Sequence, residues 1–291
     1  MGDFTFIKGY RDNEVLRNSY NQLASDIFGI HFEKWFKLGF WTNKYEPYSF
    51  VDGSKVIANV SINKINMVIS GEKKSAVQIG TVMTHPDYRG KGLSADLMEK
   101  VLEDVQGVDL IYLFANNTVL DYYPRFGFHS VEEHQPELRL NGKGKGIPLE
   151  KLDAHKEEVL NFIYQSAKSR TPGSDTFSTL ETAELLMFYC AYVFPDDIYY
   201  WSEKEIIFLM KTEGDTLHVF DVISQRELSI EEVAAEIASP DIKTVYFHFT
   251  VPSESSDITT THYKGDEVLF VKTANSLVLP ENFKHPVTSQ A

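Results

Sequence analysis

The sequence predicts an α/β protein of two domains, in which helices flank mixed, mostly antiparallel β-sheets. Strand and helix patterns alternate along both halves of the 291 residues, a length sufficient for two domains. Between the halves, the segment Asn-Gly-Lys-Gly-Lys-Gly-Ile-Pro at 141–148 has the composition of a linker. The net charge also changes there. We therefore expect one domain over residues 1–142 and a second over 147–291.

Hydrophobic periodicity predicts the elements of the first half. A period of two predicts strands, and a one-sided apolar stripe, such as the one that begins at Leu93, predicts a helix. Turn residues Asp52 and Gly53 separate two β-rich runs and indicate a hairpin. The predicted strands are 4–10, 48–51, 55–60, 65–70, 76–84 and 110–114, and the predicted helices are 14–28, 32–40 and 93–105.

The second half shows a similar order of elements. Helices are predicted at 149–167, 182–192 and 229–237, and strands at 198–201, 206–211, 217–223, 245–251 and 267–272. Ser229 and Glu232 stand at the spacing of a capping box. This order of elements is consistent with a divergent duplication, which periodicity alone does not prove.

The charge distribution argues against a nucleic-acid partner. Residues 1–147 carry 17 Lys and Arg against 18 Asp and Glu, a net charge of −1, whereas residues 148–291 carry 11 against 24, a net charge of −13. Phosphate binding needs a basic surface, which the chain lacks. The acidic half is either a solvated surface or a wall that attracts a cationic substrate such as an amine.

The chain has no feature of a membrane or secreted protein. No apolar run approaches the roughly 20 residues that span a bilayer, and the N-terminus lacks the pattern of a signal peptide. Cys190, the single cysteine, lies in an apolar run, where a buried and inert thiol is expected. We expect a cytoplasmic protein with no membrane partner and no metal, while the sequence leaves open whether it is a monomer or a homo-oligomer.

The loop between the strand at 76–84 and the helix from Leu93 is the strongest candidate for a binding site. It reads Arg89-Gly90-Lys91-Gly92-Leu93-Ser94. The free N–H groups and positive dipole of a helix N-terminus bind anions, and glycines allow close approach of the backbone. The spacing excludes a P-loop and matches the Rossmann pattern only in part.

This loop resembles the acetyl-CoA signature of the GNAT superfamily of N-acetyltransferases, whose pattern is Gln or Arg, two residues, Gly, one residue, then Gly or Ala. Arg89 and Gly92 match, whereas Ser94 stands at the last small-residue place. Asn116, followed by Tyr-Tyr-Pro-Arg-Phe-Gly-Phe at 122–128, is similar to the second motif of the family. The two motifs span 77–128, and the GNAT fold that they imply covers about 1–140.

The resemblance implies a role for each motif residue. The strand at Val82, Met83 and Thr84 would pair with the pantetheine arm of acetyl-CoA, and a backbone N–H of Met83 or Thr84 would stabilise the oxyanion. The loop from Arg89 through Gly90, Lys91, Gly92 and Leu93 to Ser94 would hold the pyrophosphate, with Asn116 beside the pantetheine. Tyr123 would be the general acid that protonates the thiolate of coenzyme A, a role that suits a phenol with a pKa near 10.

For several residues of the first half, the sequence leaves alternative interpretations open. Tyr123 could instead be ordinary core, and His85 is either a base or a surface histidine. The base that deprotonates the amine is not identified; Glu33, Glu46, Asp121 and a chain of water molecules are all open. The aromatic stretch at 31–41 either flanks the acceptor pocket or belongs to the core.

The second half lacks the glycine signature, since Ser-Gln-Arg-Glu-Leu at 224–228 leads into its helix. It resembles a degenerate, catalytically silent GNAT domain. Tandem active and degenerate domains are similar to the enhanced-intracellular-survival type of acetyltransferase, in which the C-terminal carboxylate can act near the site.

We therefore expect an N-acetyltransferase that moves an acetyl group from acetyl-CoA, by direct transfer, to a primary amine of a small cationic molecule or a peptide. A non-catalytic acyl-CoA-binding regulatory or interaction protein is the alternative, and another acyl donor, such as succinyl-CoA, is a third possibility.

Overall fold

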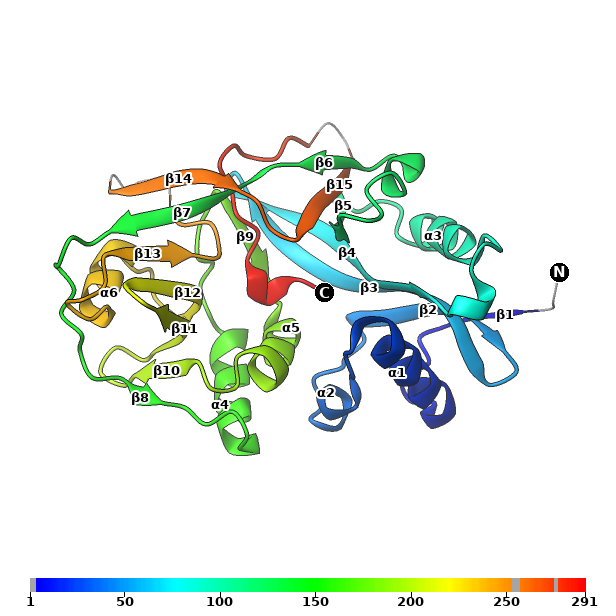
Figure 1. Ribbon diagram of the computed structural model, residues 1–291, viewed down its shortest axis with the longest axis horizontal. Helices are drawn as coiled ribbons and strands as arrows, with labels where there is room; N and C mark the ends of the chain where they lie inside the picture. The colour runs from blue at the N-terminus through cyan, green and yellow to red at the C-terminus, as the bar shows by residue number, and fades with distance from the viewer. Residues whose placement is uncertain (1–3, 253–256, 275–276) are drawn as a thin grey trace.

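Two sheets with the same strand order form the molecule (Figure 1). The computed structural model describes residues 4–252, 257–274 and 277–291. The first sheet has the order β1-β2-β3-β4-β5-β15-β6, and the second, taken from its opposite edge, has the order β8-β10-β11-β12-β13-β7-β14. In each, only the fourth and fifth strands of this path pair in parallel, β4 with β5 and β12 with β13. The second half therefore repeats the topology of the first.

The first sheet has long antiparallel strands at its centre. Its strands are β1 (Thr5–Lys8), β2 (Tyr45–Asp52), β3 (Lys55–Ile69), β4 (Glu72–Thr84), β5 (Leu110–Asn116), β6 (His129–Val131) and β15 (Glu267–Thr273). The segments predicted as two strands, 55–60 and 65–70, form the single strand β3. Its helices are α1 (Glu14–Phe28), α2 (Glu33–Lys37) and α3 (Leu93–Asp104).

The second sheet follows the same plan. Its strands are β7 (Glu133–Arg139), β8 (Glu150–Lys151), β10 (Ile198–Trp201), β11 (Ile206–Glu213), β12 (Thr216–Ile223), β13 (Thr244–Phe247) and β14 (Ile258–Tyr263). Its helices are α4 (Glu157–Lys168), α5 (Ala183–Phe188) and α6 (Ile230–Ile237). The helix expected from Leu149 begins only at Glu157, because β8 precedes it.

The two halves exchange a strand. β7 precedes the linker but pairs with β13 and β14 of the second sheet, and β15, near the end of the chain, lies between β5 and β6 of the first. A further strand, β9 (Phe177–Leu180), pairs with the far end of β3. The expected division at 142–147 therefore does not separate the sheets: each is completed by a strand from the other half. The division into two domains remains a prediction.

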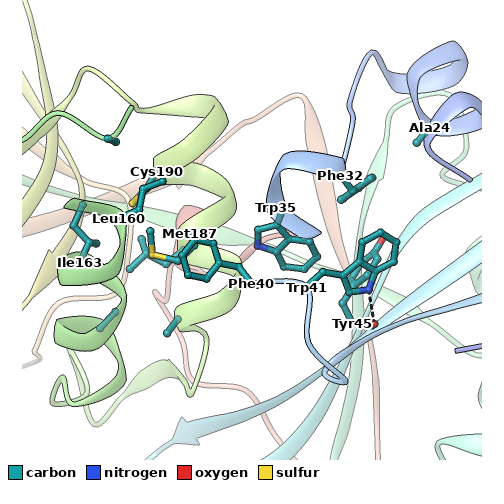
Figure 2. Packing of buried hydrophobic residues seen from close by; sticks show 14 of the residues in the cluster. Ala24, Phe32, Trp35, Phe40, Trp41, Tyr45, Leu160, Ile163, Met187 and Cys190 are labelled. Carbon is teal, nitrogen blue, oxygen red and sulfur yellow. Dashed lines mark hydrogen bonds between the residues drawn. The ribbon is translucent and has the colours of Figure 1, made fainter. Parts of the chain in front are cut away.

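The aromatic stretch at 31–41 belongs to the core where the halves meet (Figure 2). Trp35 is 1% exposed, and its indole N–H donates to the carbonyl of Glu184 at 2.8 Å. Phe40 packs on Tyr164 of α4 with ring centroids 5.0 Å apart. These side chains join the buried residues of α4 and α5, including Leu160 and Met187. The burial of this stretch favours the core over the other interpretation, a wall of the acceptor pocket.

Candidate active site

A cleft opens in the first sheet because β4 and β5 separate. They pair only from Ala76 with Leu110 to Ile79 with Leu113, although both strands continue. Beyond this point Thr81 has a φ of 49°, in the left-handed region, and the register between β3 and β4 shifts. Such a bulge bends the strand that carries the extra residue.

Side chains hold the bulge in place. The Tyr45 hydroxyl is 2.7 Å from Thr81 Oγ1, and Asn59 Nδ2 donates to the Thr81 carbonyl at 2.9 Å. Tyr45 and Asn59 are both buried, so their hydrogen bonds can hold Thr81 in its strained backbone conformation. Side chains of β2 and β3 therefore hold the bulge in place.

At the end of β4, one backbone N–H points away from β3 and toward the cleft. The N–H of His85 donates to Ile57 of β3, and Ala58 and Thr84 are the next cross-strand pair. Since hydrogen-bonded and non-hydrogen-bonded pairs alternate along an antiparallel ladder, the N–H of Thr84 points away from β3. Of the two expected oxyanion donors, Met83 and Thr84, the alternation favours Thr84.

The cleft has a volume of about 580 Å³ and gathers residues of both predicted motifs. Seven of the expected site residues line it: Val82, Met83, Thr84, Arg89, Ser94, Asn116 and Tyr123. The remaining four, Gly90, Lys91, Gly92 and Leu93, form the adjoining loop and the first residue of α3 and do not line the cleft.

The loop has the conformation that its glycines allow. Gly90 and Gly92 have φ values of 75° and 82°, and a Cβ added at either would meet nothing within 4 Å. In the part of the chain that the structure describes, the N–H groups of residues 90–94 donate no hydrogen bond. Free N–H groups at a helix N-terminus, with open space beside them, suit an anion.

The two basic residues of the loop remain exposed. Arg89 Nε donates to the carbonyl of Thr84 at 3.3 Å, which holds the arginine at the edge of the cleft. Lys91 Nζ lies 4.6 Å from the centre of the Tyr88 ring. Both charges are thus available near the loop for the pyrophosphate of a cofactor.

Tyr123 is held rigidly on one wall of the cleft. Its side chain is buried, and its ring packs against Tyr122, Phe128 and Phe270. Burial raises the pKa of Tyr123 above its ordinary value, so the hydroxyl keeps its proton at neutral pH. Tyr122, by contrast, donates to Ser94 Oγ at 3.1 Å. Tyr123 is therefore both core and cleft wall, so its two interpretations are compatible.

Asn116 is the last residue of β5 and lines the same cleft. Its Oδ1 accepts the backbone N–H of Thr118 at 3.0 Å, which fixes the side chain. The arrangement leaves the amide nitrogen available for a ligand carbonyl, since no described residue accepts a hydrogen bond from it.

The expected bases do not lie in the cleft. Glu33 pairs with Arg17 at 2.9 Å, and Glu46 pairs with Lys64 at 2.9 Å. The hydrogen bond from Arg17 lowers the pKa of Glu33, which makes it a poor proton acceptor. Asp121 is also absent from the lining, and His85 contacts Lys55 at 2.9 Å on the outer side of the loop.

Sequence reasoning missed Glu267, the carboxylate that does line the cleft. It is the first residue of β15 and lies opposite Asn116 of β5. The side chain of Glu267 remains exposed, and partial desolvation by the cleft walls, with a smaller contribution from Asp266, raises its pKa above the ordinary value. No local motif marked Glu267, because only the strand exchange brings it to the first domain.

The last residues of the chain also reach the cleft. With the Gln78 amide oriented to donate to the Ser289 carbonyl, its oxygen accepts the N–H of Ala291, both at 3.0 Å. Ala291 lines the cleft, and a Cβ on Gly80 would lie 2.7 Å from its carbonyl oxygen. The glycine at position 80 therefore permits this close approach.

The corresponding place in the second sheet is differently filled. At the end of β12, Arg170 Nη1 bonds both carboxylate oxygens of Asp221, at 3.0 and 2.9 Å, and Thr288 donates to the same carboxylate at 2.6 Å. A cavity of only about 70 Å³ remains beside them. The helix that follows, α6, is capped by Ser229, which occupies an N–H group that a phosphate would need.

Comparisons with known proteins agree with this geometry. Residues 13–131 match the family model for the acetyltransferase (GNAT) domain. Solved structures with a similar fold include a probable N-acyltransferase from Enterococcus faecalis V583, with 13% identity, a TM-score of 0.58 and coverage of 93% of this chain and 72% of that one.

Two further structures are similar over nearly the whole chain. A GCN5-related N-acetyltransferase from Kribbella flavida has 15% identity and a TM-score of 0.57, with 93% of this chain and 72% of that one covered. Eis1 from Mycobacterium abscessus has 12% identity and a TM-score of 0.57, with 92% and 73% covered. At these identities the likeness shows a common fold, and it extends over both sheets.

Two other findings concern the described ranges 4–252, 257–274 and 277–291. They contain no group of three or more His, Cys, Asp or Glu side chains placed to hold a metal ion. None of their helices combines the length and apolar character that crossing a membrane requires.

Proposed function

We propose that the protein is an acyltransferase that uses acetyl-CoA as donor and transfers the acetyl group directly to a primary amine of a small cationic molecule or a peptide. The match of residues 13–131 to the acetyltransferase (GNAT) domain supports the donor and the reaction class. The observation that carries the proposal is the cleft itself. It joins a glycine loop, the free end of β4 and a protonated tyrosine in one cavity.

In this proposal the cofactor lies in the cavity with its pyrophosphate at the glycine loop. The N–H groups of residues 90–94 and the side chain of Arg89 hold the pyrophosphate at the N-terminus of α3. The pantetheine arm continues between β4 and β5, alongside Val82 and Asn116. The thioester then lies near Tyr123, with the N–H of Thr84 available to stabilise the oxyanion.

The chain's own groups supply the proton that the leaving group needs. Amine attack on a thioester expels a thiolate, and the protonated Tyr123 hydroxyl donates to it. The second half of the chain contributes β15 to the first sheet, but its own sheet has no cofactor loop, since Arg170 and Asp221 occupy the corresponding position. The second sheet therefore binds no cofactor in this proposal.

A coenzyme A-release assay tests the proposal. Acetyl-CoA, succinyl-CoA and longer acyl donors are combined with polyamines, aminoglycosides, amino acids and peptides, and thiol release is measured. Acetyl-CoA with at least one amine should give turnover. Tight coenzyme A binding without thiol release from any amine would support the regulatory alternative instead.

A pair of arginine variants shows whether turnover depends on the cleft. Arg89→Ala removes a charge from the pyrophosphate loop and should weaken coenzyme A binding at least tenfold, which calorimetry measures. Arg226→Ala, an exposed arginine of the second half, is the control and should bind normally. Equal affinity in both variants would place the cofactor elsewhere.

A further inference from the structure

A second cavity adjoins the cofactor cleft. Its volume is about 430 Å³, and it shares Phe114, Asn116 and Glu267 with the cleft. Its other lining residues are Glu133, Tyr263, Gly265, Asp266 and Gln290. A molecule in this cavity would therefore meet the cofactor cleft at Asn116 and Glu267, close to the wall that carries Tyr123.

The charge of this second cavity is negative. Glu133 is buried and neutralised by Lys284, whose Nζ lies 2.9 Å from Glu133 Oε1. Asp266 and Glu267 form no ion pair with any residue that the structure describes. Two carboxylates are thus left to balance a cation that binds in the cavity.

The surroundings of Glu267 contain several titratable groups. Three tyrosines face Glu267 from separate elements, Tyr123, Tyr189 and Tyr263; burial raises the pKa of each, and the charge of Glu267 adds a smaller contribution. Asp266 precedes it in the chain, and the Glu133–Lys284 pair lies across the cavity. Glu267 reaches solvent through the cavity, yet the walls reduce its hydration.

We propose that Glu267 accepts the proton of the acceptor ammonium, and that the second cavity binds a small aliphatic diamine whose other ammonium group pairs with Asp266. This assignment rests on the proposed function and identifies its missing base and its substrate class. It follows from the position of Glu267 in the lining of both cavities, which no other carboxylate of the described chain shares.

Four groups take part in the transfer: the acceptor amine, the carboxylate of Glu267, the thioester and the hydroxyl of Tyr123. The ammonium gives one proton to the carboxylate of Glu267, and the neutral amine attacks the thioester carbon, forming the C–N bond. The C–S bond breaks, sulfur takes its electron pair, and Tyr123 protonates it. The tyrosinate removes the second proton from the new amide nitrogen, and Glu267 releases its proton to solvent through the second cavity.

The environment adjusts the acidity of both partners. A free alkylammonium has a pKa of about 10 and a free glutamate a pKa of about 4.3, so proton transfer is unfavourable in water. Partial desolvation raises the pKa of Glu267, although its side chain remains exposed, and desolvation in the cavity lowers the pKa of an ammonium. The two values approach one another in the cavity, as general base catalysis requires.

The test compares Glu267→Gln with wild type on two substrates. One is 1,3-diaminopropane, and the other is its 2,2-difluoro analogue, whose fluorines make both ammonium groups far more acidic. With the parent diamine at pH 7, Glu267→Gln should lose about 100-fold in kcat/KM. With the fluorinated diamine, much of which is already neutral, the loss should fall below about tenfold.

The pH profile gives an independent readout. The deficit of Glu267→Gln with 1,3-diaminopropane should shrink as pH rises and free amine accumulates, which a merely structural defect would not do. Glu203→Gln, an exposed glutamate of the second half, is the charge-matched control and should follow wild type.

The outcomes separate this inference from the proposed function. A Glu267→Gln enzyme with unchanged kcat/KM on both diamines, or with the same loss on both, overturns the role of Glu267 while the acyltransferase stands. A wild type that acetylates other amines but neither diamine overturns the substrate class. A wild type that binds no coenzyme A by calorimetry contradicts the proposed function itself.

Discussion

Glu267 lies directly opposite Asn116, where the exchanged strand β15 pairs with β5. The two residues come from different halves of the chain, yet both line the cofactor cleft and the cavity beside it. The cleft is therefore completed by the strand exchange, and a first half expressed alone lacks the carboxylate that faces Tyr123.

Tyr123→Phe should preserve the fold and coenzyme A binding but slow turnover. The ring remains packed against Phe128 and Phe270, and only the hydroxyl that donates to the thiolate is lost. We expect kcat to fall about 100-fold, with the affinity for coenzyme A unchanged by calorimetry.

Tyr122→Phe is the matched control for this prediction. It removes a hydroxyl whose bond is made to Ser94 and should change kcat less than tenfold. If the two variants had equal rates, Tyr123 would have no special role in the mechanism.

Gly92→Ala should weaken coenzyme A binding. Gly92 caps α3 with a left-handed φ of 82°, which costs an L-residue about 1 kcal/mol, and the new methyl group enters the space beside the loop. Gly53→Ala, at a φ of 61° in the β2–β3 turn, has a similar backbone cost far from the cofactor loop. Both variants should lose similar stability in urea, and only Gly92→Ala should lose affinity.

Gly80→Ala should displace the last residues of the chain from the cleft. The added Cβ would lie 2.7 Å from a backbone oxygen of Ala291, so either segment must move. We expect a loss of about 1 to 3 kcal/mol in unfolding free energy, the usual range for overpacking. Gly173→Ala, where a Cβ meets nothing within 4 Å, should be close to neutral in the same urea titration.

Trp35→Ala should destabilise both halves together. Its indole is buried where α2 meets α5 and donates to Glu184, so its removal leaves a cavity and an unpaired carbonyl (Figure 2). The expected loss is about 3 to 5 kcal/mol. Val15→Ala, at a side chain 59% exposed, should cost far less. Two separate thermal transitions in wild type would contradict a shared core.

Stability should fall as the pH drops below about 6.5, the ordinary pKa of histidine. Burial lowers the pKa of His285 to about 3, so the unfolded chain binds a proton there that the folded protein does not. Such a group stabilises the fold above pH 6.5 and loses about 1.4 kcal/mol per pH unit on acidification.

His285→Gln tests the origin of this dependence. Glutamine cannot titrate but keeps a group able to bond the Tyr112 hydroxyl, the partner of His285 Nε2 at 3.1 Å. The urea-derived stability should then fall less steeply between pH 6.5 and 4. The exposed His155→Gln should leave the slope unchanged, and a slope unaltered by either variant would exclude His285 as the source.

Local pattern was sufficient to determine most elements and the cofactor loop. Helix α1 begins and ends at the predicted residues, 14 and 28, and is capped by Asn13 and Gly29. Gly90 and Gly92 stand in the predicted loop and adopt a positive φ, which glycine allows without steric cost. Cys190 is buried and its thiol pKa is raised, in agreement with an inert cysteine. These features depend on neighbours within a few residues, which the sequence displays directly.

The partners in each sheet depended on the tertiary structure. Strands β7 and β15 carry no signal that states which sheet each joins, because pairing is decided by contacts between residues more than 100 positions apart. The same contacts placed Glu267 beside Tyr123 and put the aromatic stretch around Trp35 in the core. The sequence alone thus predicted where the donor binds. Only long-range packing decided which carboxylate faces the donor, since burial and proximity are properties of the folded chain.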